Sequence, residues 1–177
     1  MEKKLIHTIA LNYRGSIYFD EVFPLIEKLI KSDYGLLYEY NANIIKEISF
    51  FLDIETEIVS NNKNYFQLET DLNQIANNNY TLFPGLLKTT PLKKAARVLQ
   101  ICQMEKANTF INAIGGQGLY NKREFEEYNI KLYFIETRPY AYKQFSESFF
   151  SHLSIVDVLM HNGKEGTKNL LHNYNLI

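Results

Sequence analysis

The sequence lacks several features that mark particular classes of protein. Only one of its 177 residues, Cys102, is a cysteine, so no disulfide can form within one chain, and a reducing cytoplasm fits that usage. It has no run of about 18 apolar residues, the length that a membrane-spanning helix needs. The apolar part of MEKKLIHTIALNY is too short for a signal peptide. We therefore expect a cytoplasmic protein without membrane insertion.

Neither sign of charge dominates, and metal-binding spacings are missing. The chain has 19 Lys and Arg against 20 Asp and Glu, a net charge of -1, which argues against nucleic acid as a partner. The four histidines, at positions 7, 152, 161 and 172, show no H-x3-H or H-E-x-x-H pattern, so we predict no metal site. Cys102 lies among apolar neighbours at helical spacing, which favours a small core residue over a nucleophile.

Aromatic residues are abundant although tryptophan is absent. The chain holds 13 Tyr and 12 Phe, and Tyr, with a flat apolar face and a polar tip, suits a sugar or nucleotide pocket as well as an interface. An AT-rich genome, which raises Tyr, Phe, Ile, Lys and Asn together, is the simpler explanation. With 46% hydrophobic and 22% charged residues, we expect one globular domain over residues 1–177.

Periodicity predicts helices alternating with short strands. The expected helices are 17–31, which Pro24 should restart or kink, 34–52, a helix opened by Pro91, and 120–128. The expected strands are 56–60, 108–113 and 130–136. Helical connections between successive strands favour parallel pairing. The predicted fold class is therefore α/β, with a small, mainly parallel sheet flanked by helices.

A glycine-rich turn lies between an expected strand and an expected helix. Gly116-x-Gly118, with Glu136 twenty residues beyond Gly116, resembles a dinucleotide fingerprint, but Asn121 stands where the third glycine belongs. We therefore predict no cofactor. Gly115, Gly116 and Gly118 could still present N–H groups to a phosphate or carboxylate, or could serve only as a tight turn.

The stretch from Tyr142 to Gly163 carries a helix with a possible site. Ser154 is a suitable N-cap, and Asp157 three residues on resembles the second half of a capping box. Ile155, Val158 and Leu159 are expected on the buried face, and Asn162-Gly163 is expected to end the helix. Asp157 with His152, Tyr142 and Gln144 resembles an acid/base arrangement, and a capping or solvent-facing carboxylate is the simpler alternative.

Tyr142, Gln144 and Phe149, followed by LSIVDVL and Asn162-Gly163, resemble the C-terminal signature of the WbqC-like protein family. Further matches are Tyr13, Tyr18-Phe19, Asn43, ARVLQIC before Gly115-Gly116, and Tyr120 with Phe125, so that the resemblance covers about residues 7 to 166. It implies a role in O-antigen or other surface-polysaccharide biosynthesis, where such proteins have been suggested to transfer glycine or a related acyl group to an amino sugar.

The resemblance also implies the site and its partner. The base would be His7 or Asp157, and the Gly115–Gly118 turn would supply oxyanion donors. The ligand, a nucleotide-linked amino sugar, would contact Asn12, Tyr13, Gly115, Gly116, Gly118, Tyr120, Tyr142, Gln144 and Ser154. The alternative is a non-catalytic module that binds a sugar nucleotide or another protein.

One departure bears on both alternatives. The family's N-terminal motif, which contains Trp, has no counterpart here, so the expectation is an N-terminally shortened domain that has no transferase activity by itself. An uncovered sheet edge would then favour a homo-oligomer or a partner enzyme.

Overall fold

The computed structural model describes residues 2–60, 65–68, 70 and 92–177. They form two compact units: unit 1 consists of residues 1–60 and 138–173, and unit 2 of residues 61–137 and 174–177. Pro91 and most of residues 61–90 lie outside the described residues. The prediction of a single domain over the whole chain stays a prediction.

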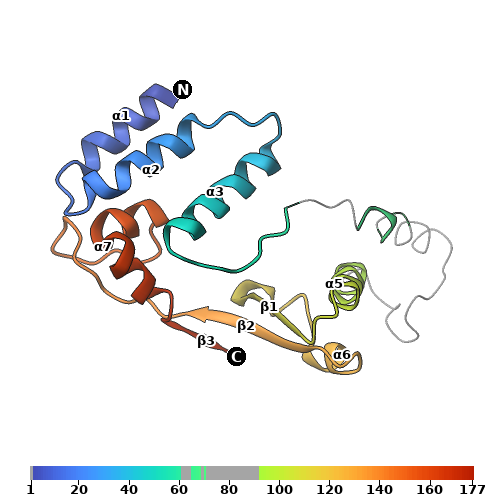
Figure 1. Ribbon diagram of the computed structural model, residues 1–177. Helices are drawn as coiled ribbons and strands as arrows, with labels where there is room; N and C mark the ends of the chain where they lie inside the picture. Colours follow the sequence, from blue (N-terminus) through green and yellow to red (C-terminus); the bar gives the residue numbers. More distant parts are fainter. Residues whose placement is uncertain (1, 61–64, 69, 71–91) are drawn as a thin grey trace. The chain divides into compact units, whose positions relative to one another are not determined.

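Unit 1 is built from four helices, α1 (Glu2–Tyr13), α2 (Phe19–Lys31), α3 (Leu37–Phe51) and α7 (Ile155–Leu170). In Figure 1, α1 runs beside α2, and α7 lies against the same helix. The helices predicted over 17–31 and 34–52 are confirmed. Helix α2 continues through Pro24, so the helix does not restart at this residue, and the alternative prediction of a kink there stays a prediction.

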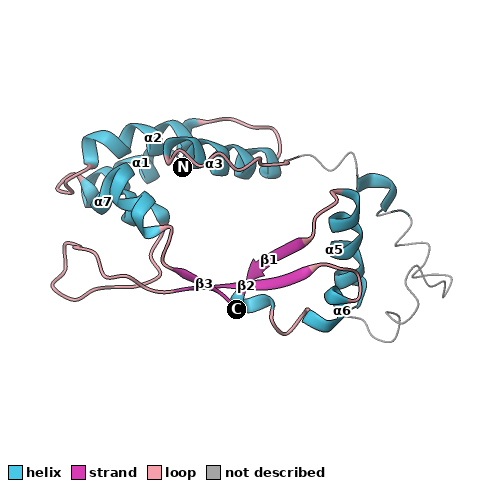
Figure 2. Ribbon diagram, turned by 60° about the horizontal axis from the view of Figure 1, so that its bottom comes forward, coloured by secondary structure: helices cyan, strands magenta, loops and turns pink. Residues whose placement is uncertain are grey.

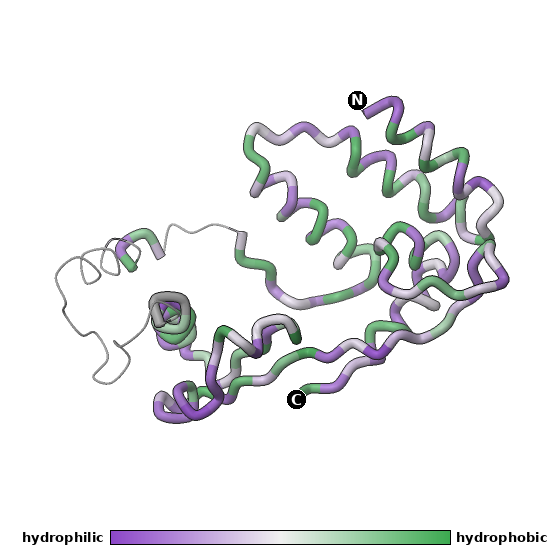
Figure 3. The backbone as a smooth tube through the Cα atoms, turned by 180° about the vertical axis from the view of Figure 1, so that it is seen from behind, coloured by the Kyte–Doolittle hydropathy of each residue, from purple (hydrophilic) through white to green (hydrophobic). Residues whose placement is uncertain are grey.

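The core of unit 1 draws on segments far apart in the sequence. Val22 and Ile26 of α2 meet Leu52, at the end of α3, and Leu159 and Met160 of α7, all of them buried. Hydrophobic and hydrophilic residues alternate along these helices at helical spacing (Figure 3), which lets each helix turn one face inward. Each Å² of apolar surface that is removed from water in this way stabilises the folded unit by about 25 cal/mol.

Helix α7 begins as predicted and differs from the prediction further along. The Ser154 hydroxyl accepts a hydrogen bond from the Val156 N–H at 3.3 Å, which confirms the N-cap. The buried face holds Leu159 and Met160, whereas Ile155 is 36% exposed. The predicted position of Ile155 on the buried face is therefore wrong.

Gly163 divides α7 into two helical stretches. Its φ of 61° and ψ of -168° belong to a backbone region that is open essentially to glycine alone. The first stretch therefore ends where the helix stop was predicted, at Asn162-Gly163, and a second stretch that the sequence analysis did not predict continues to Leu170. A Cβ on Gly163 would lie 2.5 Å from the Tyr18 ring, so the turn also lets the two segments approach closely.

Residues 54–60 form no strand, so the strand predicted over 56–60 is wrong. The β-branched pattern IETEIVS gives an extended segment, but a strand also needs a neighbour whose backbone groups it can pair with. Only Ile54 among these residues donates a backbone hydrogen bond to another described residue, namely to the Ser49 carbonyl at 2.8 Å. Pattern alone therefore overestimated the sheet.

Unit 2 contains all three strands that the described residues form (Figure 2). The elements are α5 (Leu92–Met104), β1 (Thr109–Ala113), the short 3₁₀ helix η2 (Ile114–Gly116), α6 (Lys122–Glu126), β2 (Lys131–Thr137) and β3 (Tyr174–Leu176). Leu99 and Cys102 of α5 pack with Phe125 of α6 and with Leu132 and Phe134 of β2. Burial raises the pKa of the Cys102 thiol, which fits the predicted core role.

The sheet is mixed rather than mainly parallel. β1 pairs with β2 in parallel, as predicted for strands joined through a helix, but β3 pairs with β2 antiparallel. β3 was not predicted, because three residues are too few to show an alternating pattern. The predicted mainly parallel sheet is therefore corrected to a three-stranded mixed sheet in order β1-β2-β3, within a mainly helical chain.

Substitution of Gly163 by Ala should destabilise the protein by about 2–4 kcal/mol, because the new Cβ meets both an unfavourable φ and the Tyr18 ring. Gly35→Ala is the matched control, since a Cβ there meets nothing within 4 Å, and its effect should stay within about 0.5 kcal/mol. Urea unfolding measures both variants. Equal midpoints for the two would contradict the role assigned to Gly163.

Candidate functional site

A buried carboxyl group lies at the centre of unit 1. Asp157, in the first turn of α7, is 7% exposed. Its Oδ1 accepts a hydrogen bond from the Tyr142 hydroxyl at 2.7 Å and a longer one from Gln144 Nε2 at 3.4 Å. Its Oδ2 accepts one from the Tyr13 hydroxyl at 3.0 Å. These bonds offset the large cost of removing a carboxylate from water.

The three donors come from two segments that are remote from each other in the sequence. Tyr13 is the last residue of α1, and Tyr142 and Gln144 lie on the loop that leads to α7. Tyr13 is 144 residues from Asp157, and Tyr142 is 15 residues from it. The carboxylate therefore fixes the end of α1 and the loop to the start of α7.

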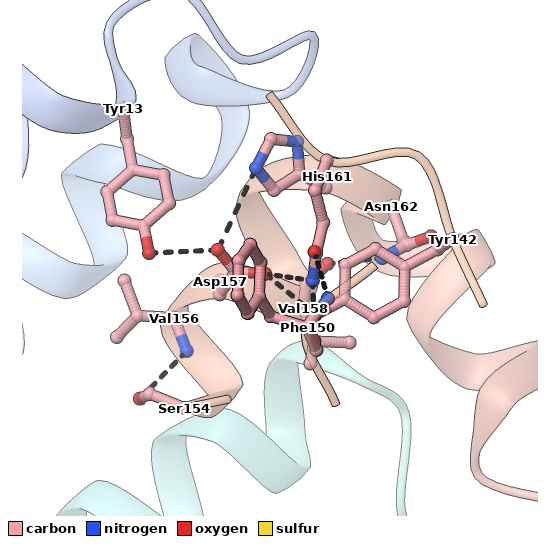
Figure 4. Close-up of polar contacts among 10 residues, drawn as sticks. Tyr13, Tyr142, Phe150, Ser154, Val156, Asp157, Val158, His161 and Asn162 are labelled. Carbon is pink, nitrogen blue, oxygen red and sulfur yellow. Dashed lines mark hydrogen bonds and ion pairs between the residues drawn. The ribbon is translucent and has the colours of Figure 1, made fainter. Parts of the chain in front are cut away.

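His161 is the fifth member of this group, and we refer to Tyr13, Tyr142, Gln144, Asp157 and His161 as the Asp157 cluster. The His161 Nε2 atom lies 3.8 Å from Asp157 Oδ2, and Figure 4 shows Tyr13 and His161 both reaching this carboxylate. The His161 side chain is only 7% exposed. Its ring packs edge-on against Phe145, with centroids 4.7 Å apart.

A loop held by Gln144 carries Phe145 to that position. The Gln144 amide donates to the Phe150 carbonyl at 2.9 Å and accepts from the Phe150 N–H at 2.9 Å, which closes a short loop between the two residues. Within it, Phe149 packs edge-on against Tyr142 at 5.3 Å between centroids. Phe145 remains 59% exposed, so its ring lies between His161 and solvent.

The surroundings make both tyrosines weaker acids. Burial, followed by the hydrogen bond to Asp157, raises the pKa of Tyr13 from 10.0 to about 12. The same two causes raise the pKa of Tyr142 to about 12. Both hydroxyls therefore keep their protons near neutral pH and act as donors to the carboxylate.

The cluster contains only part of the predicted site. Tyr13, Tyr142, Gln144 and Asp157 come together, and Ser154 caps the helix that carries Asp157. The simpler alternative for Asp157, a solvent-facing group, is wrong because the residue is buried. The other alternative was that Asp157 caps the helix. Its carboxylate accepts hydrogen bonds from side chains, and among the described residues no backbone N–H of the helix donates to it.

The other predicted residues of unit 1 are exposed and do not belong to the Asp157 cluster. His7 is exposed on α1, and Asn12 is exposed and donates to the Thr8 carbonyl of its own helix. His152, which the sequence placed near Tyr142, is exposed and has a φ of 59°. Their proposed roles in binding or catalysis stay predictions.

Sequence reasoning missed His161 as a member of the group. The signal was present, because Asp157 and His161 stand four residues apart within an expected helix and such residues share one helix face. A lone i,i+4 pair of this kind is common in exposed helices, so it did not stand out. Only the burial of both side chains distinguishes it.

The glycine turn lies in unit 2 and packs closely at one position. A Cβ on Gly116 would clash with the side-chain amide of Asn112, so this amide would have to move to admit any other residue at position 116. Gly115 and Gly118 have open space at their Cβ positions. The helix that follows is five residues long, and Asn121 already caps its Arg123 N–H at 3.0 Å.

Tyr120 belongs to the aromatic packing of unit 2. Its ring lies edge-on to Phe110 at 5.7 Å and to Phe125 at 5.9 Å between centroids. This geometry assigns Tyr120 a place in the core, and a contact with ligand stays a prediction.

The described residues form neither a metal-binding group nor a membrane-spanning helix. No group of three or more His, Cys, Asp and Glu side chains in the described ranges could hold a metal ion. Among the helices that the structure describes, none is long and apolar enough to cross a membrane.

Comparison with known proteins gives one match. The sequence pattern of the WbqC-like protein family matches residues 1–169, a range that includes every member of the Asp157 cluster. No curated protein and no solved structure matches the chain.

Tyr13→Phe and Tyr142→Phe should each remove a tyrosine that loses its proton only near pH 12. Because the pKa of each hydroxyl is raised in the folded protein, its contribution to stability is complete below pH 10 and is lost as the pH rises from 10 to 12. The wild type should therefore lose more stability than either variant over this range, measured by urea unfolding at each pH.

Tyrosinate absorbance in the native protein gives a second measure. Each variant should lack one proton release near pH 12, and Tyr140→Phe, an exposed residue of the same loop, corrects for the loss of one chromophore. Titration curves that differ from the wild type only in the total amplitude, with no change near pH 12, would argue against the hydrogen bonds to Asp157.

Proposed function

This chain belongs to the WbqC-like protein family, and we propose that it acts in surface-polysaccharide biosynthesis by transferring glycine or another acyl group to a nucleotide-linked amino sugar. The family is associated with surface-polysaccharide gene clusters. The observation that carries the proposal is that the signature residues Tyr142 and Gln144, together with Tyr13, donate to the buried carboxylate of Asp157. This carboxylate lies beside the imidazole of His161.

The proposed chemistry is an acyl transfer in which His161 handles the proton. The amine nitrogen of the sugar attacks the carbonyl carbon of an activated carboxyl group, and a C–N bond forms. The bond between that carbon and its leaving group breaks, and the leaving group takes the electron pair. The amine proton passes to His161 Nδ1, the ring nitrogen that does not face Asp157.

In this scheme Asp157 is a positioning residue. Its oxygens already accept from Tyr13, Tyr142 and Gln144, which leaves the carboxylate poorly suited to take a substrate proton itself. It faces His161 Nε2 and orients the ring, so that Nδ1 is the nitrogen left for the substrate. The distance of 3.8 Å is long for a hydrogen bond, and catalytic hydrogen bonds of this kind often shorten when substrate binds.

The second candidate is a non-catalytic module that binds a sugar nucleotide or a partner protein. It is favoured by the enclosure of the His161 side chain, which is only 7% exposed and has the Phe145 ring against it. For the transferase, the loop that carries Phe145 has to move away before substrate can approach Nδ1. For the binding module, the Asp157 cluster serves only to hold α1, the loop and α7 together.

His161→Gln should abolish transfer, because an amide cannot take up the amine proton, while His172→Gln should leave transfer unchanged. His172 is an exposed histidine near the end of unit 1, so it is a control for the same substitution. The purified chain is incubated with activated glycine and a UDP- or dTDP-linked amino sugar, and the amide product is measured by mass spectrometry.

Three outcomes separate the two candidates. Product from wild type and His172→Gln, but not from His161→Gln, supports the transferase. Product from all three proteins would contradict the role of His161. Binding of the sugar nucleotide without any product from the wild type would favour the binding module, and this is the outcome that the resemblance implies if the chain is an N-terminally shortened domain.

A further inference from the structure

A hollow lies in unit 1 on residues that take no part in the Asp157 cluster. It is open to solvent, has a volume of about 230 Å³, and is lined by Lys46, Ser49, Phe50, Ile54, Thr56 and Ile58. The first three stand on α3 at spacings of three and four residues, which places them on one helix face. The last three alternate along the extended segment after α3, so they share one side of it.

The aromatic wall of this hollow is unusually exposed. Phe50 has 82% of its surface in contact with solvent, whereas its neighbour Phe51 packs against the core of unit 1. Ile54 and Ile58 line the same hollow from the extended segment. An exposed ring beside two aliphatic side chains offers an apolar face of the kind on which the C–H face of a sugar ring can pack.

The polar groups of the hollow fit a phosphorylated ligand. Lys46 Nζ donates to Ser60 Oγ at 2.9 Å, which orients the ammonium group with one of its three N–H donors. Ser49 and Thr56 add hydroxyl groups to the lining. A lysine ammonium is a common partner of phosphate, and hydroxyls can exchange hydrogen bonds with those of a sugar.

The acidic residues nearby do not place a negative charge beside the Lys46 ammonium in the hollow. Glu55 and Glu57 alternate with the lining residues, so their side chains leave the other side of the extended segment. Glu47 is paired with Lys28 at 2.8 Å. The ammonium of Lys46 is therefore the charge that lines the hollow.

We propose that this hollow binds the sugar phosphate part of a nucleotide-linked sugar, with the pyranose ring on Phe50 and a phosphate on Lys46. The volume of about 230 Å³ lies below the usual 300–1,000 Å³ of a whole small-molecule pocket, so the nucleotide extends beyond it. The inference rests on the proposed function for the class of ligand, and it locates the sugar on α3 and the segment after it.

The test is a binding titration of the full chain with glucosamine 1-phosphate, glucosamine and inorganic phosphate, followed by calorimetry and by thermal shift. Glucosamine 1-phosphate should bind saturably and raise the melting temperature. Phe50→Ala should weaken its binding by about tenfold through loss of the packing face. Lys46→Gln should weaken it by a similar factor, and should not change binding of glucosamine, which carries no phosphate.

Matched controls are Phe66→Ala, a phenylalanine of unit 2 that is 72% exposed, and Lys3→Gln, an exposed lysine of α1. Neither should change the affinity. Circular dichroism of all four variants checks that the fold is kept, which is expected because the Phe50 ring is largely in solvent and the Lys46 residue is exposed.

Three results would overturn the assignment. The first is the absence of saturable binding, and the second is binding that Phe50→Ala and Lys46→Gln leave unchanged. The third is inorganic phosphate binding as tightly as the sugar phosphate with no effect of Phe50→Ala, which would show an anion contact only. Because the titration contains no acyl donor, it is independent of the transfer assay. Absence of product from the wild type in that assay, with binding of the sugar phosphate intact, would overturn the proposed function and leave this site standing. Product from the wild type, with binding that neither variant weakens, would overturn this site and leave the proposed function standing.

Discussion

Unit 1 depends on the cost of burying one carboxylate. Asp157 is nearly excluded from water, and a buried charge without partners would cost several kcal/mol. Three side-chain donors offset this cost, and they come from the end of α1 and from the loop before α7. These donors link the end of α1 and the loop to α7, whose Leu159 and Met160 lie in the apolar core, so the polar cluster and the apolar core act together in holding the unit.

The need to pair the buried Asp157 carboxylate also explains the residue spacing of the family signature in this chain. Tyr142 and Gln144 bond to Asp157, Gln144 also closes the loop at Phe150, and Phe149 packs on Tyr142. The Tyr-x-Gln-x4-Phe spacing therefore builds a loop whose inner side faces the carboxylate. Gly163 lies two residues beyond His161 and allows Tyr18 to approach α7. A signature of this kind serves packing and chemistry at once, so stability and activity are expected to respond together to many of its substitutions.

The two functional proposals place different demands on unit 1. Acyl transfer at His161 requires access to an imidazole that is enclosed in the structure, whereas sugar binding at Phe50 and Lys46 uses groups that are already exposed. Ile54 connects the two regions, because it lines the hollow and also packs against the core that contains Leu159 and Met160. A ligand in the hollow therefore contacts a residue whose neighbours lie on the helix of Asp157.

The sequence by itself determined the elements whose signals are local. Helical periodicity placed α2 and α3, the Ser154 hydroxyl marked the start of α7, and runs of β-branched and aromatic residues placed β1 and β2. Tertiary structure decided the rest. It left residues 54–60 without a strand partner, added β3 to the sheet, and resumed α7 after Gly163. It also buried Asp157 beside His161 and brought Tyr13 to it across 144 residues, because the cost of an unpaired buried carboxylate depends on which donors the fold places around it.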